Sequence, residues 1–461
     1  MQARGLALAL AAVFALACGD AGRSEPPSNL ILISLDTLRA DHLGCYGRDR
    51  NTSPAIDALA AAGVRFADAS ATSPWTLPSH ASMLTGLYPS SHGVRQRSHR
   101  LPEERVTLAE SLAEHGYQTF AVVNSLSFGR RFAVLQGFGP EAVTYIPEIL
   151  ETGGGRLIVN SAPRIVEKAY ERLDARDAQR PFFLFLHFYD AHSDYTPQRS
   201  YRTRLVGDYD GEVTGSTDQL LRIQEAGKTL SDADVRFLRE LYDAEIRELD
   251  DVLAGFFASL EARGRLQDTL IVLTSDHGEE FQEHGGLLHG DTQYQEVLAV
   301  PLILRGPGIP RGRVVTEPVS LVDVVPTVLA VLGVPGAGAF DGIDLSPSWA
   351  DSPEPLPRRL LFSDASHLVG KGHGGRGYPR RMVRDGDEKL CTDRSTGDAE
   401  LYDLSRDPGE TDDLARRRPE RVAELLAALA EHVSGRVDAE ANDQPLSEQE
   451  RSLLRSLGYV E

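Results

Sequence analysis

The feature that most constrains this chain is a series of short apolar runs separated by helical patterns. Asn29–Leu35 reads NLILISL, which is rich in branched side chains and carries no charge. Such a run is typical of a parallel strand that is buried on both faces. Similar runs occupy residues 119–123, 181–188, 269–275 and 298–304. The alternation predicts an α/β fold with a mainly parallel sheet and helices on both faces.

Four helices are predicted between or after these strands, over residues 54–62, 107–115, 232–263 and 322–332. Ser53 and Pro54 supply an N-cap residue and a first-turn proline for the first of them. The third has apolar residues near helical spacing, so it is expected to lie along the sheet on one amphipathic face.

The composition changes at residues 346–357, where serine and proline are frequent, and this segment is predicted to be a linker. It separates a predicted catalytic domain over residues 29–345 from a C-terminal subdomain over residues 358–461. The subdomain is expected to be a small antiparallel sheet with helices. Its predicted strands cover residues 360–363, 382–391 and 400–404, and its helices cover residues 419–434 and 447–457.

The N-terminus has the pattern of an export signal. Residues 1–17 place one arginine before an apolar stretch that is too short to span a bilayer. Cys18 follows Ala-Leu-Ala, which is similar to a bacterial lipobox, and residues 18–28 are small and polar, as expected of a tether. We expect an exported lipoprotein on the periplasmic face of a bacterial membrane. Plain cleavage and an uncleaved anchor are the alternatives.

The overall charge is strongly negative, with 48 Lys and Arg against 68 Asp and Glu, a net charge of -20. Such a field repels nucleic acid and anionic membranes. We therefore expect no nucleic-acid partner and no membrane contact except through a lipid anchor. Any anionic substrate must bind in a local positive environment. The three cysteines are too few for a disulfide scaffold.

Acidic and histidine side chains follow three of the predicted strands. Asp36 ends the first, Asp190 and His192 follow the third, and Asp276 and His277 follow the fourth. Because active groups collect at the carboxyl ends of parallel strands, these side chains are expected to lie close together. Carboxylate oxygen and imidazole nitrogen are ligands for one cation. The sequence therefore predicts a metal site at this edge of the sheet.

Thr76 is the candidate nucleophile. It precedes Leu77 and Pro78, after which apolar residues recur at helical spacing, so Thr76 is expected at or next to a helix N-cap. The free N–H groups of a helix N-terminus favour an anion. A hydroxyl held there beside a cation could attack sulfur or phosphorus. Capping alone is the structural alternative.

Several ordered segments resemble the sulfatase family of the alkaline phosphatase superfamily. They are LISLDTLRADHLGCYG, WTLPSHASMLTGLYPSSHGV, TSDHGEEFQEHG, LLHGDTQYQEVLAVPLILRGPG, ELYDLSRDPGETDDLA and SLLRSLGYVE. The resemblance implies an alkaline-phosphatase-like fold. It also implies metal ligands at Asp36, Asp276 and His277, a nucleophile at Thr76, and a substrate contact near His289.

The chain departs from the family pattern at four places. Thr37 stands where many members have a second ligand aspartate. His80 replaces an arginine of the family and is expected to contact substrate in its place. Thr76 replaces the cysteine or serine that becomes formylglycine, so no formylglycine is expected. Residues 121–125 lack a lysine and a histidine of the family, which leaves Asn124 as a substrate contact.

Other residues have less specific assignments. His289, or His192, is expected to protonate the leaving oxygen and later activate water. His187 is either a histidine behind the ligands or a substrate contact, and Arg39 would hold the substrate anion or a carboxylate. Glu279, like its neighbour Glu280, is expected to be solvated or to lie behind the ligands.

We expect a metal-dependent hydrolase of sulfate esters with one divalent cation, Ca, Mn or Zn. A phosphodiester or phosphonate hydrolase or phosphotransferase using Thr76 is one alternative, and a catalytically silent binding protein is another. In the phosphoester alternative Asp190, His192 and His289 would hold a second cation. The substrate is expected to be a small anionic ester, or a sulfated or phosphorylated glycan or lipid, selected by loops over residues 146–164 and 195–230.

Overall fold

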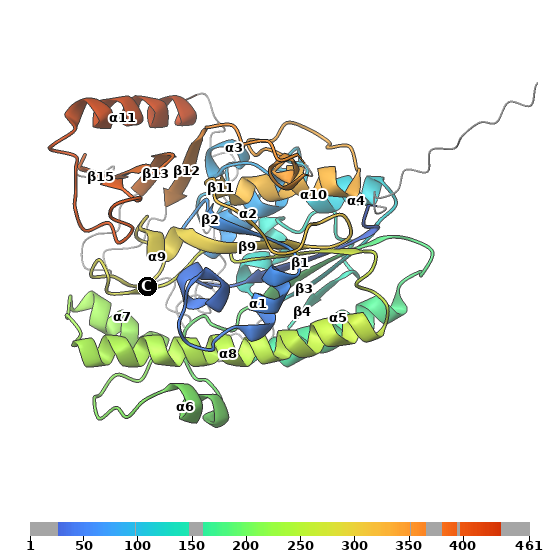
Figure 1. Cartoon of the computed structure of the whole chain (residues 1–461), viewed down its shortest axis with the longest axis horizontal. Helices are drawn as coiled ribbons and strands as arrows, with labels where there is room; N and C mark the ends of the chain where they lie inside the picture. The colour runs from blue at the N-terminus through green and yellow to red at the C-terminus, as the bar shows by residue number, and fades with distance from the viewer. Residues whose placement is uncertain are drawn as a thin grey trace, which may run out of the picture.

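The computed structural model describes residues 26–96, 98–146, 160–350, 352–365, 380–393 and 397–434. Within them a nine-stranded sheet has the order β10-β2-β9-β6-β1-β5-β3-β4, with β11 beside β2 (Figure 1). Its strands are β1 Asn29–Leu35, β2 Val64–Ser70, β3 Gln118–Val123, β4 Val143–Tyr145, β5 Phe182–Phe188, β6 Thr269–Thr274, β9 Ala299–Arg305, β10 Arg313–Val315 and β11 Val319–Ser320. The predicted α/β class is confirmed, and the start and end of β1 agree with the prediction.

Helices cover both faces of this sheet. Figure 1 shows α8 and α5 below it, with α2, α4 and α10 above. The helices are α1 Pro54–Ala61, α2 Thr76–Thr85, α3 Pro89–His92, α4 Leu108–Glu114, α5 Ala162–Ala175, α6 Arg199–Leu205, α7 Thr217–Glu225, α8 Asp232–Ala262, α9 Gln295–Leu298, α10 Val324–Leu332 and α11 Pro419–Val433. Short 3-10 helices are η1 Ala40–His42, η2 Gly44–Tyr46, η3 Leu126–Phe128, η4 Arg130–Phe132, η6 Leu321–Asp323 and η7 Ser346–Trp349.

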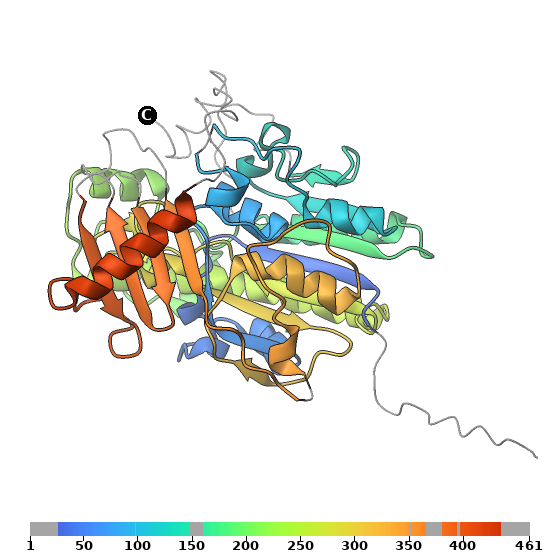
Figure 2. The same cartoon turned by 90° about the horizontal axis from the view of Figure 1, so that it is seen from above.

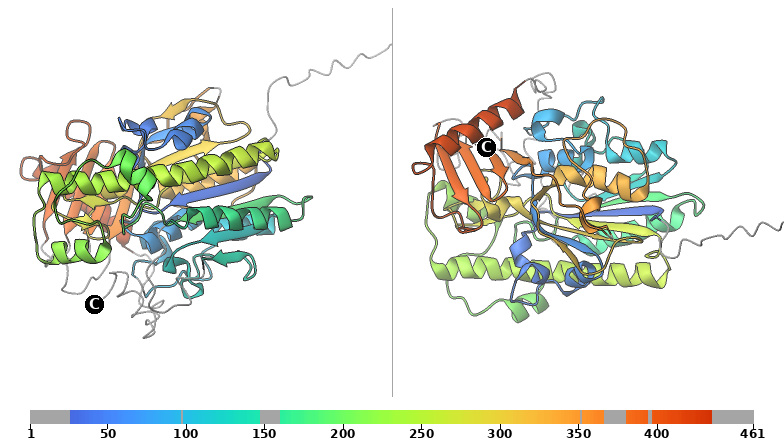
Figure 3. Two further views of the ribbon diagram at one scale, coloured as in Figure 1. Left: turned by 90° about the horizontal axis from the view of Figure 1, so that it is seen from below. Right: turned by 45° about the horizontal axis from the view of Figure 1, so that its top comes forward.

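Strand β1 shows why its sequence is apolar throughout. Leu30 and Leu32 belong to the core that α2, α4 and α10 complete, whereas Ile31 and Ile33 belong to the core beneath α1, α5 and α8. Alternate side chains therefore enter different cores, and both must be apolar. Figure 3 shows α8 lying along β1 on the second of these faces.

Strand β9 corrects one expectation, because it runs antiparallel to both β6 and β2. The other four predicted strands of the sheet pair in parallel: β1 pairs with β5 and with β6, and β3 pairs with β5. A strand that is buried on both faces is apolar in either direction, so its pattern carries no information about its orientation.

The C-terminal sheet has the order β12-β13-β14-β15, formed by β12 Leu360–Ala365, β13 Arg380–Asp385, β14 Glu388–Asp393 and β15 Ala399–Asp403, and all its pairs are antiparallel. Helix α11 crosses these strands (Figure 2). The expected single strand over residues 382–391 is a hairpin instead, with a turn at Gly386, whose φ of 62° favours glycine. Met382 and Cys391 join the core of the large sheet, so the two sheets pack together.

The first part of the predicted linker forms η7. Its Trp349 is buried and packs edge-on against Phe66 of β2, with 5.9 Å between the ring centroids. The two expected specificity loops also contain regular structure, because α6 and α7 lie within residues 195–230 and α5 begins at Ala162. These segments were assigned from composition alone, which does not register short amphipathic turns.

Capping boxes begin α4 and α8, whereas the predicted cap at Ser53 is absent. Thr107 and Ser231 each form a capping box, the second with Asp234 at N3. Ser53 precedes α1, but its hydroxyl makes no cap hydrogen bond. It donates instead to Asp57 Oδ1 at 3.0 Å and accepts from the Gly44 N–H at 2.9 Å.

Several predictions fall outside the described residues. They include the signal peptide over residues 1–17, the lipidation site Cys18, most of the tether and the helix over residues 447–457. In the parts of the chain that the structure describes, no helix combines the length and the apolar character needed to cross a membrane.

Candidate active site

Asp36, Asp276 and His277 form a buried cluster at the carboxyl ends of β1 and β6. These strands pair in parallel with Ser34 opposite Thr274, and the two aspartates stand two residues further along each strand. One ligand atom from each of the three residues lies within 4.8 Å of the others. The cluster is therefore a candidate metal site.

Three of the four carboxylate oxygens of this cluster lack hydrogen-bond partners among the described residues. Both oxygens of Asp36 and Oδ2 of Asp276 are buried in this state. Burial raises the pKa of both carboxyls, and the charge of Asp36 raises that of Asp276 further. A buried, unpaired carboxylate is costly unless a cation compensates it, so this donor set fits a divalent cation.

Thr76 is the first residue of α2 and lies next to the N-cap, as predicted. Trp75 occupies the N-cap position and makes no side-chain cap bond. The Thr76 hydroxyl lies 3.4 Å from His277 Nε2, and Ser79 of the same helix donates to the Asp276 carbonyl at 2.7 Å. The helix N-terminus thus places the hydroxyl beside the metal-site cluster, where the dipole favours an anion.

His80, which was predicted to bind substrate, is fully buried one turn into α2. Its Nδ1 donates to the Thr76 carbonyl at 2.8 Å, and its Nε2 lies 2.8 Å from Ser34 Oγ. Burial lowers the pKa of His80 to about 4, so the ring is neutral at physiological pH. It supplies no positive charge where the family has an arginine.

His187 lies beside the cluster on β5. Its Nε2 is 3.3 Å from Asp36 Oδ2, and neither ring nitrogen has a hydrogen-bond partner among the described residues. Burial lowers its pKa to about 4. The ring packs against Phe128 and His80, which places it behind the ligands while leaving one nitrogen directed at Asp36.

A second group next to His277 consists of His192, His289 and Glu279. The His289 ring packs on His277 with 4.4 Å between centroids and meets the edge of His192 at 4.9 Å. His289 Nδ1 lies 2.9 Å from Oε1 of Glu279, which is fully buried rather than solvated. His192 stacks on Tyr189, and burial lowers its pKa to about 4. Both predicted proton carriers therefore border the metal-site cluster.

Asp190 and Asn124 belong to a separate hydrogen-bond network. The Ser161 hydroxyl donates to Asp190 Oδ2 at 2.7 Å and accepts from Asn124 Nδ2 at 2.5 Å. Burial raises the pKa of Asp190, and burial together with the charge of Asp190 raises the pKa of Glu245 on α8. Asp190 is not part of the three-residue cluster.

Arg39 is engaged with carboxylates. Its guanidinium pairs with Asp41 at 2.7 Å and Glu283 at 2.6 Å, and Nη1 also donates to the Glu279 carbonyl at 2.9 Å. Of the two roles predicted for Arg39, these contacts support the carboxylate partner.

Sequence reasoning missed the residues that position the predicted ones. Tyr195 donates to Glu279 Oε2 at 2.8 Å, and Ser34 and Ser161 hold His80 and Asp190. Glu279, which stands in the Asp-His-Gly-Glu run, is among the residues predicted to be solvated or to lie behind the ligands. The serines and the tyrosine carry no comparable signal, because their roles depend on contacts between distant segments.

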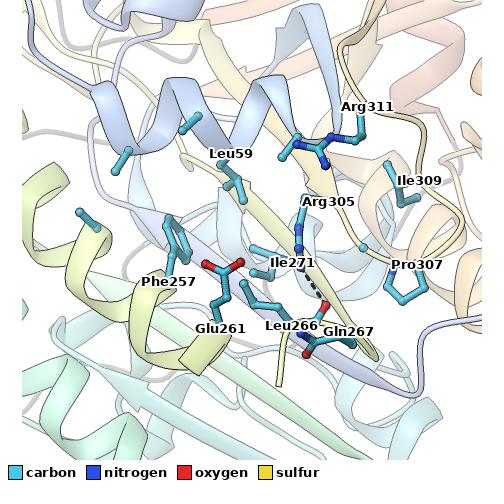
Figure 4. A pocket seen from close by; sticks show the side chains of 15 residues that line it. Leu59, Phe257, Glu261, Leu266, Gln267, Ile271, Arg305, Pro307, Ile309 and Arg311 are labelled. Atoms are coloured by element: carbon cyan, nitrogen blue, oxygen red, sulfur yellow. Dashed lines mark hydrogen bonds between the residues drawn. The ribbon is translucent and has the colours of Figure 1, made fainter. Parts of the chain in front are cut away.

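An open groove of about 640 Å³ lies at the opposite end of β6 (Figure 4). Leu266 and Ile271 line it together with Phe257 of α8, and Arg305 donates to the Leu266 carbonyl at 2.8 Å. None of the residues predicted for the active site lines this groove, so it is not the catalytic pocket.

Comparisons with known proteins identify the family and the fold. The family described as Sulfatase matches residues 28–334. Arylsulfatase A from Homo sapiens is 30% identical over 494 aligned positions, covering 92% of this chain and 89% of that protein. The Agrobacterium radiobacter phosphonate monoester hydrolase has a TM-score of 0.69 at 23% identity, covering 88% of this chain and 96% of that one.

A third similar protein was solved with its substrate D-glucosamine-2-N,6-O-disulfate. It has a TM-score of 0.71 at 20% identity and covers 91% of this chain and 99% of that one. At these identities the two solved structures establish a shared fold.

Proposed function

The chain belongs to the sulfatase family, and from this premise we propose that it is a metal-dependent hydrolase of sulfate esters with Thr76 as its nucleophile. One observation carries the proposal. The Thr76 hydroxyl lies 3.4 Å from His277 Nε2, beside Asp36 and Asp276, three of whose four buried carboxylate oxygens have no hydrogen-bond partner among the described residues.

Asp36, Asp276 and His277 would hold one divalent cation, such as Ca, Mn or Zn. When bound, the cation supplies Lewis-acid polarisation of the ester and lowers the pKa of a nearby hydroxyl. The three ligands suit it because they combine two anionic oxygens with one imidazole nitrogen at the same strand edge.

The reaction proceeds in two displacements. Thr76 Oγ1 forms a bond to sulfur as the bond between sulfur and the leaving oxygen breaks, and the hydroxyl proton passes to solvent. His289 protonates the leaving oxygen. Water then attacks sulfur and gives a proton to His289, while Thr76 recovers its proton as it leaves. His192 is the alternative proton carrier. Thr76 is not expected to be converted to formylglycine, so its hydroxyl itself is the attacking group.

A phosphoester substrate is the second candidate, and the neutral His80 favours it. The family arginine is absent here, and residues 121–125 offer neither the lysine nor the histidine of the family. The similar fold of a phosphonate monoester hydrolase agrees with this alternative. In a two-cation form of it, Asp190, His192 and His289 would hold the second ion, although Ser161 already occupies one oxygen of Asp190.

A substrate panel distinguishes these functions. Purified protein should be assayed with 4-nitrophenyl sulfate, 4-nitrophenyl phosphate, bis(4-nitrophenyl) phosphate and 4-nitrophenyl phenylphosphonate. The proposal predicts the highest kcat/KM with the sulfate. A preference for the diester or the phosphonate would establish the second candidate. No turnover of any of them, together with no bound metal, would establish a silent binding protein.

We also propose that the natural substrate is a small anionic ester or a sulfated or phosphorylated glycan or lipid. The structural relative solved with a glucosamine disulfate supports the glycan class. Turnover of sulfated mono- and disaccharides tests this, and hydrolysis of simple aryl esters alone would contradict it.

We further propose export and lipid anchoring through Cys18, with residues 18–28 as a tether to the catalytic domain. Changing Cys18→Ser should move the protein from the membrane fraction to the soluble periplasmic fraction. Wild-type protein that is already soluble and unlipidated would contradict the anchor.

A further inference from the structure

Glu279 lies between two partners that fix both of its carboxylate oxygens. Oε1 lies 2.9 Å from His289 Nδ1, and Oε2 accepts a hydrogen bond of 2.8 Å from the Tyr195 hydroxyl. The side chain is fully buried, and it lies outside the three-residue metal cluster. A buried carboxylate with two hydrogen-bond partners is held in one orientation.

Tyr195 ties Glu279 to a distant part of the fold. The tyrosine is buried, and its ring packs against Tyr242 of α8 and Phe281 of β7 (Glu280–Phe281). Its backbone N–H donates to the Gly215 carbonyl at 3.0 Å. Because burial and the neighbouring carboxylate raise the pKa of Tyr195, the phenol stays protonated and donates a hydrogen bond to Glu279.

His289 contacts the other carboxylate oxygen of Glu279, Oε1. It follows β8 (Leu287–Leu288), and its ring is packed between His277 and His192. A carboxylate only accepts hydrogen bonds, so Nδ1 of His289 must carry the hydrogen that faces Glu279. The ring nitrogen that exchanges a proton with the reaction is then Nε2, and the ring is not free to rotate.

We propose that Glu279, held by Tyr195, is a positioning residue that fixes the ring and tautomer of His289 for proton transfer to the leaving group. The inference rests on the proposed function. In the first displacement His289 Nε2 gives its proton to the leaving oxygen while Nδ1 keeps the hydrogen shared with Glu279. In the second, Nε2 takes a proton from the attacking water, which restores the starting state.

The kinetic test compares two leaving groups. Wild type, Glu279→Gln and Glu279→Ala are assayed with 4-nitrophenyl sulfate, whose phenol leaves easily, and with phenyl sulfate, whose phenol needs a proton. The corresponding phenylphosphonates replace them if the wild type prefers phosphorus. Since positioned proton transfer contributes about 10²–10⁴-fold, we expect Glu279→Ala to lose about 100-fold or more in kcat with the phenyl ester but only about 10-fold with the nitrophenyl ester.

Two matched variants separate positioning from a structural role. Tyr195→Phe removes one hydroxyl only, and it should show the same leaving-group dependence at a smaller amplitude. Glu280→Gln changes the adjacent buried glutamate, which makes no hydrogen bond to His289 among the described residues. This variant should leave kcat unchanged with both esters. Equal losses with both esters in Glu279→Gln and Glu279→Ala would overturn the inference.

A measurement independent of turnover keeps the inference testable if the proposed function fails. The ¹⁵N chemical shifts of His289 in selectively labelled protein report which ring nitrogen carries hydrogen. In wild type we expect hydrogen on both nitrogens of the cationic ring and on Nδ1 in the neutral ring, and in Glu279→Ala we expect the neutral ring to lose its preference for Nδ1. Retention of the Nδ1–H tautomer in Glu279→Ala would overturn the positioning role, whereas a wild type inactive on every ester would overturn the proposed function alone.

Discussion

Two buried aspartates at the same edge of the sheet have opposite surroundings. Asp36 follows β1, and neither of its oxygens has a hydrogen-bond partner among the described residues. Asp190 follows the adjacent strand β5, and one of its oxygens accepts a 2.7 Å hydrogen bond from Ser161, which is tied in turn to Asn124. Both carboxyls have a raised pKa because they are buried.

We propose that this difference separates a metal ligand, Asp36, from a structural acid, Asp190. A buried carboxylate whose hydrogen bonds are supplied by the protein is stable as it stands, whereas one without them needs a cation. The ends of β1 and β6 are therefore the proposed reactive region, which we call the open end. Next to this region lies the hydrogen-bond network of Asp190, Ser161 and Asn124, which supports it and which we call the closed end.

The largest expected effect is a loss of activity confined to the open end. Asp276→Asn should lower kcat/KM by about 10⁴-fold or more, because the cation and its Lewis-acid chemistry are lost together. Asp190→Asn should stay within about 10-fold of wild type, since an amide can still bond to Ser161. Initial rates on the best aryl ester measure both. A comparable loss in Asp190→Asn would erase the distinction and favour the two-cation alternative.

Thr76 gives the next largest effect. Thr76→Ala should reduce kcat by about 10³-fold or more, because a covalent nucleophile is removed. The fold should survive, since Trp75 rather than Thr76 is the N-cap of α2. Thr76→Ser keeps the hydroxyl and should retain activity. Thermal unfolding and single-turnover rates check the two variants. Unchanged turnover in Thr76→Ala would remove Thr76 from the mechanism.

In the metal-free protein, substitutions at the open end and at the closed end should change the free energy of unfolding in different directions. Asp36→Asn removes an unpaired buried carboxylate and should stabilise the metal-free protein by about 1–3 kcal/mol. Asp190→Asn disturbs a satisfied network and should destabilise it or leave it unchanged. Urea unfolding after chelator treatment measures both free energies. Destabilisation in both variants would show that Asp36 is already satisfied within the protein.

Arg39 provides the smallest effect, because its partners are structural. Burial raises the pKa of Glu283, but Arg39 and Arg239 together overcome this effect and lower it to about 2 from an ordinary value near 4.5. A depressed carboxyl pKa contributes stability above its unfolded value, and that stability is lost as the pH falls from about 4.5 to about 2. Glu283→Gln should therefore destabilise the protein by about 1–2 kcal/mol at pH 7 and by much less near pH 2.

Thermal unfolding at the two pH values checks this pair, and KM should not change in Glu283→Gln. An increase in KM without a change in stability would restore Arg39 to substrate binding.

The predictable part of this molecule is the part that local pattern determines. β1 has the bounds that its apolar run predicts, and Asp36 follows it directly. The candidate metal cluster also follows from topology, because parallel neighbours place Asp36 beside Asp276. The direction of β9 is not encoded in this way, since a doubly buried strand is apolar in either orientation.

The rest of the site depends on contacts between distant segments. Glu279 and Tyr195 are 84 positions apart, and nothing in either local sequence announces their hydrogen bond. His80 was expected to meet substrate because an arginine stands there in the family. Its burial and its bond to Ser34 are consequences of packing between α2 and β1.

Metal stoichiometry tests the central claim most directly. Metal-free wild type, Asp36→Asn and Asp190→Asn should be dialysed against Ca²⁺, Mn²⁺ or Zn²⁺ and the bound ion counted by plasma mass spectrometry. The account predicts one tightly bound ion in wild type and in Asp190→Asn, and none in Asp36→Asn. An ion retained at full occupancy in Asp36→Asn, or lost in Asp190→Asn, would contradict the assignment of the open end as the metal site.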